Sequence, residues 1–535
     1  MKTFNTTAVC IPSKHYMVDL ADRVREIRKL VDAGKYFTIT RARQYGKTTT
    51  LQALDKALTD DYVVLNLSFE GLTYANFEKE QAFVRAFCRL LKEDPLLYQA
   101  IPETVRRQLE DYIGQKEEQA TMSELFITLG EWCAISDKPV VLMIDEVDSA
   151  TNNQVFRDFL ALLRDKYIKR ESRGFPAFQS VILVGVTDIR HLKRKIRENA
   201  DDSDPDTMVN ENSPWNIAAD FTVDMSLPED GIKVMLDEYE ADHHTGMDTP
   251  AIAKQIWEYT NGYPFLVSRI CELIDLTVSK TMPPSEAWTA KGMDEAVKLL
   301  LAEDNTLFAA LTKNLNNYPA LKASIKSLLM EGTRLVYNPD QNDIVQMKMY
   351  GFIRNDQNVV KIDNRIFETR LYNLFLSDEE LKSNVFSQAG EFAKNIFIED
   401  GRLNVRLILE RFIDTYHEIC GQLEDSFKEK DGREQFLLYL RPIINGTGNY
   451  YIEAQTRDHK RTDVIVDYLG QQYIIELKIW HGERYHAKGE EQIADYLNYW
   501  KLDTGYMLSF NFNKEKKSGV ERVRVGDKIL FEGTV

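Results

Sequence analysis

The stretch ITRARQYGKTTTL, residues 39–51, carries residue types suited to binding phosphate. Gly46, Lys47 and Thr48 match the end of the pattern G-x-x-x-x-G-K-[ST], although Arg41 replaces its first glycine. In such a loop the glycine lets backbone N–H groups approach the phosphates, the lysine reaches the β and γ oxygens, and the threonine hydroxyl binds Mg²⁺. The stretch therefore predicts a site for ATP with Mg²⁺.

The missing first glycine leaves two interpretations of this loop open. Because that glycine mainly shapes the turn, an altered loop path would tolerate Arg41 in its place. Alternatively, Arg41 or Arg43 contacts phosphate directly. Arg43 and Thr49 are counted with the loop residues above as expected nucleotide contacts.

Two apolar runs further along the chain end in polar residues. In PVVLMIDEVDSA (139–150) the run ends in Asp145, suited to holding Mg²⁺, and Glu146, suited to polarising the attacking water. In SVILVGVTD (180–188) it ends near Thr187, whose hydroxyl is suited to sensing the γ-phosphate. Each motif alone is common in other contexts, but the combination favours an ATP-hydrolysing site.

The C-terminal region carries a different set of chemical groups. In YIIELKI (473–479), Glu476 and Lys478 are two residues apart, so both side chains face the same side of a strand. With Asp463 on the preceding strand, the carboxylates are suited to Mg²⁺ or Mn²⁺ and the lysine to orienting water, with Glu453 completing the metal shell. This pattern predicts phosphodiester hydrolysis, although a salt bridge on a solvated sheet face would also produce it.

The elements that must position the first set of residues alternate between strand and helix. A helix is expected over 21–35, and another follows the phosphate loop. Five strands are expected, at 36–40, 62–69, within 139–150, at 180–188 and at 221–225. This alternation is typical of a doubly wound α/β sheet.

The loop RARQYGKTT resembles the arginine-bearing loop R-P-R-R-F-G-K-[ST] of the AAA-ATPase-like family of bacterial proteins. The resemblance extends to SPWNIA (213–218) and NGYPFLV (261–267). It implies an ATPase core followed by a helical lid, with Gly262 and Pro264 close to the nucleotide. Arg269 would then be a lid arginine that touches phosphate, although a surface salt bridge is its more common role.

The order D…E-x-K followed by Q-x-x-x-Y resembles the PD-(D/E)XK nuclease superfamily over roughly residues 432–510. Gln492 and Tyr496 supply the last motif, on the helix after the E-x-K strand, and the expected α-β-β-β-α-β order agrees. Thr462 stands where the superfamily has proline, directly before Asp463. The resemblance implies a metal-dependent nuclease.

Five parts are predicted on these grounds, and the fold class is α/β throughout. A helical lid and a winged-helix-like segment follow the doubly wound P-loop ATPase core, and a helical connector leads to an α/β PD-(D/E)XK nuclease-like domain. The expected bounds of these five parts are, in order, 1–227, 228–300, 301–380, 381–431 and 432–535.

Composition narrows the class of protein. The 535 residues are 44% apolar and 28% charged, with a formal charge of −17, which argues against a protein that depends mainly on non-specific DNA binding. Basic residues gather around the predicted nuclease site, at 457–461 and 481–488. Five scattered cysteines, no apparent signal peptide and no spanning apolar run favour a cytoplasmic protein without a membrane partner.

The expected function is an ATPase whose nucleotide cycle regulates or drives nucleic-acid cleavage, with DNA favoured over RNA. ATP and nucleic acid are the expected partners, and a homo-oligomer is compatible with the sequence. Two alternatives stay open: a nucleotide-controlled switch whose C-terminal domain binds nucleic acid without cutting it, and an interaction ATPase with a structural tail.

Overall fold

The computed structural model divides the chain into two compact units: an N-terminal unit of residues 2–227 and 349–351, and a C-terminal unit of residues 228–348 and 352–535. The described residues are 2–114, 120–187, 189, 193–195, 208–210, 214–330, 335–380, 385–393, 396–420, 429–444, 448–451, 464–468, 471–479, 490, 493–494, 497–498, 502–511 and 518–535.

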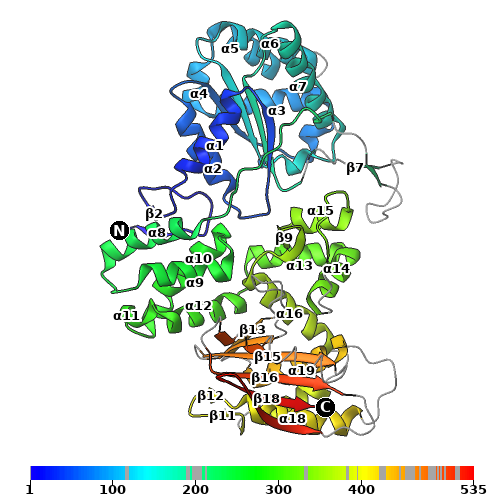
Figure 1. Ribbon diagram of the computed structural model, residues 1–535. Coiled ribbons are helices and arrows are strands. Elements are labelled where there is room, and N and C mark those ends of the chain that lie inside the picture. Colours follow the sequence, from blue (N-terminus) through cyan, green and yellow to red (C-terminus); the bar gives the residue numbers. More distant parts are fainter. Residues whose placement is uncertain are drawn as a thin grey trace. The chain divides into compact units, whose positions relative to one another are not determined.

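A four-stranded parallel sheet forms the centre of the N-terminal unit (Figure 1). In spatial order its strands are β3 (Tyr36–Thr40), β6 (Ser180–Gly185), β5 (Val140–Asp145) and β4 (Val63–Ser68). All six residues of β5 and of β6 are buried, which explains their nearly uninterrupted apolar character. The α/β prediction is confirmed for these four strands.

Helices cover both faces of this sheet. Apolar side chains of α1 (Ala21–Asp32) and α2 (Lys47–Leu58) pack on one face. The other face is covered by a helical layer inserted largely between β4 and β5. The elements of that layer are η1 (Tyr74–Phe77), α3 (Glu80–Glu93), α4 (Pro95–Ala100), α5 (Glu103–Gly114), α6 (Met122–Ile135) and α7 (Gln154–Arg173).

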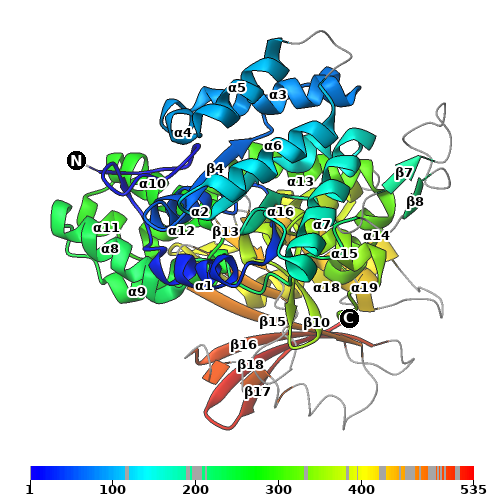
Figure 2. The same cartoon turned by 90° about the horizontal axis from the view of Figure 1, so that it is seen from above.

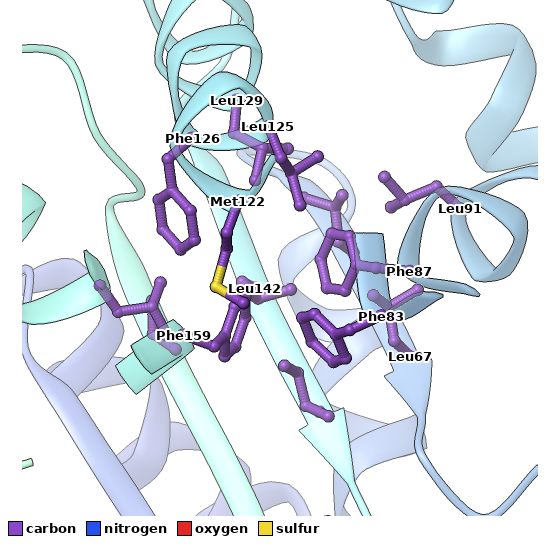
Figure 3. Close-up of a cluster of buried hydrophobic side chains, with 14 of the residues drawn as sticks. Leu67, Phe83, Phe87, Leu91, Met122, Leu125, Phe126, Leu129, Leu142 and Phe159 are labelled. Atoms are coloured by element: carbon purple, nitrogen blue, oxygen red, sulfur yellow. The ribbon is translucent and has the colours of Figure 1, made fainter. Parts of the chain in front are cut away.

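Figure 3 shows how the inserted layer is fastened to the sheet. Phe159 of α7 lies 5.3 Å from Phe83 and 5.5 Å from Phe126, measured between ring centroids. These rings meet Leu67 of β4 and Leu142 of β5 in one buried cluster. The cluster joins three helices to the two strands, so it holds β5, whose last residue is Asp145, in a fixed position.

The strand predicted at 221–225 is wrong. This segment runs beside β3 through a single parallel bridge, between Phe37 and Ala219, and then remains irregular. Side chains take up its carbonyl groups: Arg41 donates to Val223 O at 2.9 Å, and Arg23 donates to Met225 O at 3.0 Å. Because guanidinium groups replace the ladder partners, no fifth strand forms.

Two short strand pairs complete the N-terminal unit. The first is parallel and joins β1 (Thr3–Phe4) to β2 (His15–Tyr16). The second is antiparallel and joins β7 (Lys193–Lys195) to β8 (Met208–Asn210).

The C-terminal unit begins with helices where a lid and a winged-helix-like segment were expected. An antiparallel hairpin of β9 (Ile353–Asp356) and β10 (Val359–Ile362) is the only sheet among the described residues of 228–380. The helices are α8 (Glu229–His243), α9 (Thr249–Thr260), α10 (Pro264–Leu276), η5 (Val278–Lys280), α11 (Pro284–Ala287), α12 (Ala290–Ala302), α13 (Thr306–Asn317), α14 (Pro319–Met330), α15 (Asn342–Met349) and α16 (Arg365–Glu380).

A six-stranded mixed sheet ends the chain, and Figure 2 shows β15, β16, β18 and β17 following one another across it. In spatial order the strands are β13 (Gly448–Tyr451), β14 (Val464–Tyr468), β15 (Gln471–Ile479), β16 (Thr504–Phe510), β18 (Lys528–Thr534) and β17 (Gly519–Val525). β15, β16 and β18 are parallel to one another, whereas the other neighbouring pairs are antiparallel.

Helices before this sheet pack against it. Phe412 of α18 (Val405–Cys420) and Tyr416 lie 6.4 and 5.7 Å from the ring of Phe510 in β16. Thus α18, in the stretch predicted as a connector, shares a core with the sheet. The other elements here are α17 (Val385–Ala393), β11 (Ile398–Glu399), β12 (Arg402–Leu403) and α19 (Glu429–Ile444). In the described part of the chain, no helix has the length and apolarity needed to cross a bilayer.

Candidate nucleotide site

The phosphate-binding loop closes through two left-handed residues. Gln44 has a φ of 56° and Gly46 a φ of 73°, and α2 begins at Lys47 directly after that glycine. Left-handed residues between right-handed ones turn successive backbone N–H groups toward one side, which creates a concave anion site. No side chain caps the N-terminus of α2, so its first N–H groups point out of the helix toward that site.

Lys47 lies inside the loop and is only 6% exposed. Its ammonium donates to Ala42 O at 3.0 Å and to Arg41 O at 3.2 Å. Burial lowers the pKa of Lys47, while the carboxylates of Glu146, Asp148 and Asp145 act in the opposite direction. These acids favour the charged form that phosphate binding requires.

Thr48 and Asp145 meet although they come from different elements. The Thr48 hydroxyl donates to Asp145 Oδ2 at 2.7 Å, and Asp145 Oδ1 accepts from the backbone N–H of Glu146 at 2.9 Å. Oxygen ligands of octahedral Mg²⁺ lie 2.0–2.1 Å from the ion, so neighbouring ligands stand about 2.9 Å apart. The oxygen chemistry and spacing of this pair therefore fit Mg²⁺.

Glu146 follows Asp145 in a left-handed conformation, with φ 54° and ψ 43°. Burial raises the pKa of its carboxyl group. Lys47 opposes that rise, whereas Asp145, Asp148 and Glu70 add to it. Glu146 is thus a more basic carboxylate than an ordinary glutamate, which suits a group that accepts a proton from water.

Thr187 lies just beyond β6, and its position depends on a residue that the sequence analysis missed. The carboxylate of Asp148 accepts from the backbone N–H of Thr187 at 2.6 Å and from that of Val186 at 2.7 Å. The only feature of the sequence that pointed to Asp148 is that an acidic residue lies three positions after Asp145. Its spacing could not reveal a contact with another strand.

The other loop residues have different surroundings. Arg41 donates to Thr40 O at 2.8 Å and to Val223 O, and it lies 5.5 Å from the Phe221 ring centroid, so its contacts are with the protein. Arg43 is exposed, and its charge lowers the pKa of Lys47. The Thr49 hydroxyl accepts from the backbone N–H of Cys10 at 3.3 Å, which joins the N-terminal segment to α2.

The residues implied as lid contacts belong to the C-terminal unit. Gly262 has a φ of 71°, and Pro264 begins α10. Arg269 forms ion pairs with Glu272 and Glu303. Arg269 thus has the salt-bridge role that is the more common one for such an arginine.

Two residues of the predicted nuclease site lie together on β15. Lys478 Nζ is 3.1 Å from Glu476 Oε1, and Glu476 is 2% exposed, so the pair is not on a solvated face. Glu453, Asp463, Gln492 and Tyr496 lie outside the described residues. Among the residues that the structure describes, no group of three or more His, Cys, Asp or Glu side chains is arranged to hold a metal.

Neighbouring strands place two further polar groups on the face of Glu476 and Lys478. Ser509 of β16 pairs with Lys478, and Glu532 of β18 shares a row with Glu476 through Met507. Paired residues point to the same face of a sheet. Ser509 is 1% exposed, and its hydroxyl has no hydrogen-bond partner among the residues that the structure describes.

No curated protein matches the sequence. A Walker-type ATPase of Pyrococcus abyssi is similar at 13% identity and a TM-score of 0.45, covering 69% of this chain and 99% of that one. The Aeropyrum pernix ORC2 protein, solved with ADPNP and ADP, is similar at 13% identity and a TM-score of 0.32, covering 67% and 93%.

The Aeropyrum pernix ORC1 protein, solved with DNA, is similar at 10% identity and a TM-score of 0.28, covering 68% of this chain and 94% of that one. Such values are too low to transfer an activity or a ligand. Residues 4–377, more than half of the chain, match the family model described as an AAA-like domain. The chain belongs to the AAA-like domain family.

Proposed function

We propose that the N-terminal unit binds ATP with Mg²⁺ and hydrolyses it at the carboxyl ends of β3, β5 and β6. The observation that carries the proposal is the 2.7 Å contact between Thr48 of the phosphate loop and Asp145 at the end of β5. It brings two separate motifs to one edge of a parallel sheet, where such sheets bind ligands. Membership of the AAA-like domain family supports the same assignment.

Each residue has a role that follows from its position. Backbone N–H groups of the loop and the Lys47 ammonium hold the β and γ phosphates, with Arg43 at the exposed rim. Thr48 and Asp145 would hold Mg²⁺, which when bound would neutralise the charge that develops on the phosphates. Glu146 orients the attacking water and accepts its proton, while Thr187 donates to the γ-phosphate.

Two variants test this assignment. Lys47→Ala should lose ATP binding, because it removes the buried ammonium. Glu146→Gln should bind ATP and release phosphate at least about 100-fold more slowly, because it cannot accept a proton. Binding is measured with a fluorescent ATP analogue, and turnover by phosphate release. Wild-type protein that binds no ATP, or Lys47→Ala that binds normally, would contradict the proposal.

A second candidate function is metal-dependent hydrolysis of nucleic acid, DNA above all, at the C-terminal sheet. The buried Glu476–Lys478 pair favours it. Glu476 is only 2% exposed, and removing a charged pair from water costs free energy, so a pair kept in this place suggests a functional role. The assignment requires Asp463 opposite Glu476, and the described pair Val464 with Ile475 has the register that this needs. Glu453, Gln492 and Tyr496 remain proposed members of this site.

Under this second proposal the metal is Mg²⁺ or Mn²⁺, which would polarise the phosphate and activate water. The carboxylates of Asp463, Glu476 and Glu453 would hold it, and Lys478 would orient the water. Asp463→Ala should abolish Mn²⁺-dependent nicking of plasmid DNA while leaving folding intact. An unchanged nicking signal, or no calorimetric binding of Mn²⁺, favours a domain that binds nucleic acid or protein without cutting.

A further inference from the structure

We propose that Asp148 is a positioning residue for ATP hydrolysis, which holds the backbone of Thr187 at the distance from Glu146 that turnover needs. The inference rests on the function proposed for the nucleotide site. Asp148 is not one of the motif residues that the sequence singled out. The contacts of its carboxylate carry the inference.

The carboxylate of Asp148 bridges two strand ends. Asp148 lies in η2 (Val147–Ala150), the short 3-10 helix that begins directly after Glu146. Its Oδ2 accepts from Val186 N–H at 2.7 Å and its Oδ1 from Thr187 N–H at 2.6 Å. Since both amides follow β6, one side chain ties the turn after β5 to the turn after β6. Hydrogen bonds to an ionised acceptor are about twice as strong as neutral ones.

Gly185 provides the space for this bridge. It is the last residue of β6 and does not have a positive φ, so its backbone conformation alone does not require glycine. A Cβ atom there would lie 2.9 Å from Asp148 Oδ2 and 3.1 Å from Val147 Cγ2. The Gly185 carbonyl also accepts from Arg41 N–H at 3.1 Å, at the start of the phosphate loop. Three turns around the site therefore meet at Gly185 and Asp148.

The surroundings of Asp148 suit positioning better than general stabilisation. In the described part of the chain Asp148 forms no ion pair within 4.0 Å, and the two amides are its side-chain partners. Burial dominates the pKa of both Lys47 and Glu146, and the Asp148 carboxylate raises each of them. The charge of Asp148 thus acts on Lys47 and Glu146, in the same site whose turns its carboxylate holds together.

The test compares turnover with affinity in the full-length protein. Asp148→Asn keeps the shape but replaces one acceptor oxygen by a donor, so it should lower kcat about 10- to 100-fold with little change in ATP affinity. Gly185→Ala should reproduce this loss, because its Cβ displaces the carboxylate. Asp165→Asn is the matched control: it removes one carboxylate from a half-buried pair with Lys169, away from the site, and should behave like wild type.

A double variant shows whether Asp148 acts through Thr187. If it does, Asp148→Asn combined with Thr187→Ala should be no slower than the slower single variant. Losses that multiply, a wild-type kcat in Asp148→Asn, or an affinity that falls in step with kcat would overturn the inference. Thermal unfolding of each variant identifies a loss that comes only from misfolding.

Hydrogen exchange gives a readout that does not depend on ATP hydrolysis. The amides of Val186 and Thr187 should exchange faster in Asp148→Asn than in wild type, while those of β4 are unchanged. Unchanged exchange at both amides would overturn the inference. A wild-type protein without any ATPase activity would instead overturn the proposed function, and the exchange experiment would still decide whether Asp148 holds this turn.

Discussion

At the scale of single residues, the site places the buried ammonium of Lys47 near several carboxylates. The effects of these charges on one another set the pH dependence of hydrolysis. Burial raises the pKa of Glu146, with Asp145, Asp148 and Glu70 adding to the rise and Lys47 opposing it. Hydrolysis needs the deprotonated carboxylate. The acidic limb of the kcat profile should therefore lie above the range of an ordinary glutamate, and Asp148→Asn should move it downward.

The same shift predicts that Glu146 costs stability at neutral pH. A carboxyl group whose pKa is raised by folding contributes stability below its unfolded pKa, and that contribution is lost as the pH rises through the folded pKa. Glu146→Gln, which stays neutral, should therefore melt at a higher temperature than wild type at pH 7.5 without nucleotide. The difference should shrink toward pH 5. A variant that melts lower than wild type at pH 7.5 would contradict this account.

At the scale of elements, apolar runs identified the parallel strands because both faces of these strands are buried. β5 and β6 have no exposed residue, so no polar position interrupts their sequence signal. The run at 221–225 looked similar, but Arg41 and Arg23 take its carbonyl groups, and distant side chains cannot be read from a local pattern. The edge strand β17, GVERVRV, escaped prediction because charged residues interrupt it.

The candidate site was predictable to a similar extent. Gly46, Lys47, Thr48, Asp145 and Glu146 stand out because phosphate and Mg²⁺ chemistry requires those residue types at fixed spacing. The bridge from Asp148 to Thr187 escaped notice because it joins two strands whose adjacency only the fold determines.

Arg41 shows how an element can use a residue that departs from the motif. Arg41→Gly would restore the common loop pattern, but it removes donors to Thr40 O and Val223 O and the contact with Phe221. We expect a loss of about 1.5–3 kcal/mol in unfolding free energy with ATP affinity retained. Arg43→Ala, at an exposed position, should weaken ATP binding and lower stability less than Arg41→Gly does. Denaturant unfolding and analogue titration measure both.

An equal loss of affinity in the two variants would contradict the structural role of Arg41. Arg41→Lys provides a further control, since it keeps the positive charge but lacks the planar fork that reaches two carbonyl groups. It should resemble Arg41→Gly in stability if the fork matters, and wild type if charge alone suffices.

At the scale of the whole molecule, each compact unit holds one of the two proposed chemistries. Lys47 belongs to the N-terminal unit and Lys478 to the C-terminal unit. We propose that ATP binding or hydrolysis in the first regulates cleavage by the second. Without this coupling, the chain would carry two independent activities.

Lysine variants of the two units test the coupling in one assay, on linear, circular and single-stranded DNA with Mn²⁺, with and without ATP. Lys478→Ala should stop cleavage under both conditions while hydrolysing ATP like wild type, because it changes only the C-terminal site. Lys47→Ala should cleave at a rate that ATP no longer alters. If wild-type protein cleaves DNA at the same rate with and without ATP, the proposed coupling is wrong and the two activities are independent. If Lys478→Ala still cleaves DNA, the proposed nuclease site is wrong, and nucleotide binding by the AAA-like domain is the proposed activity that remains.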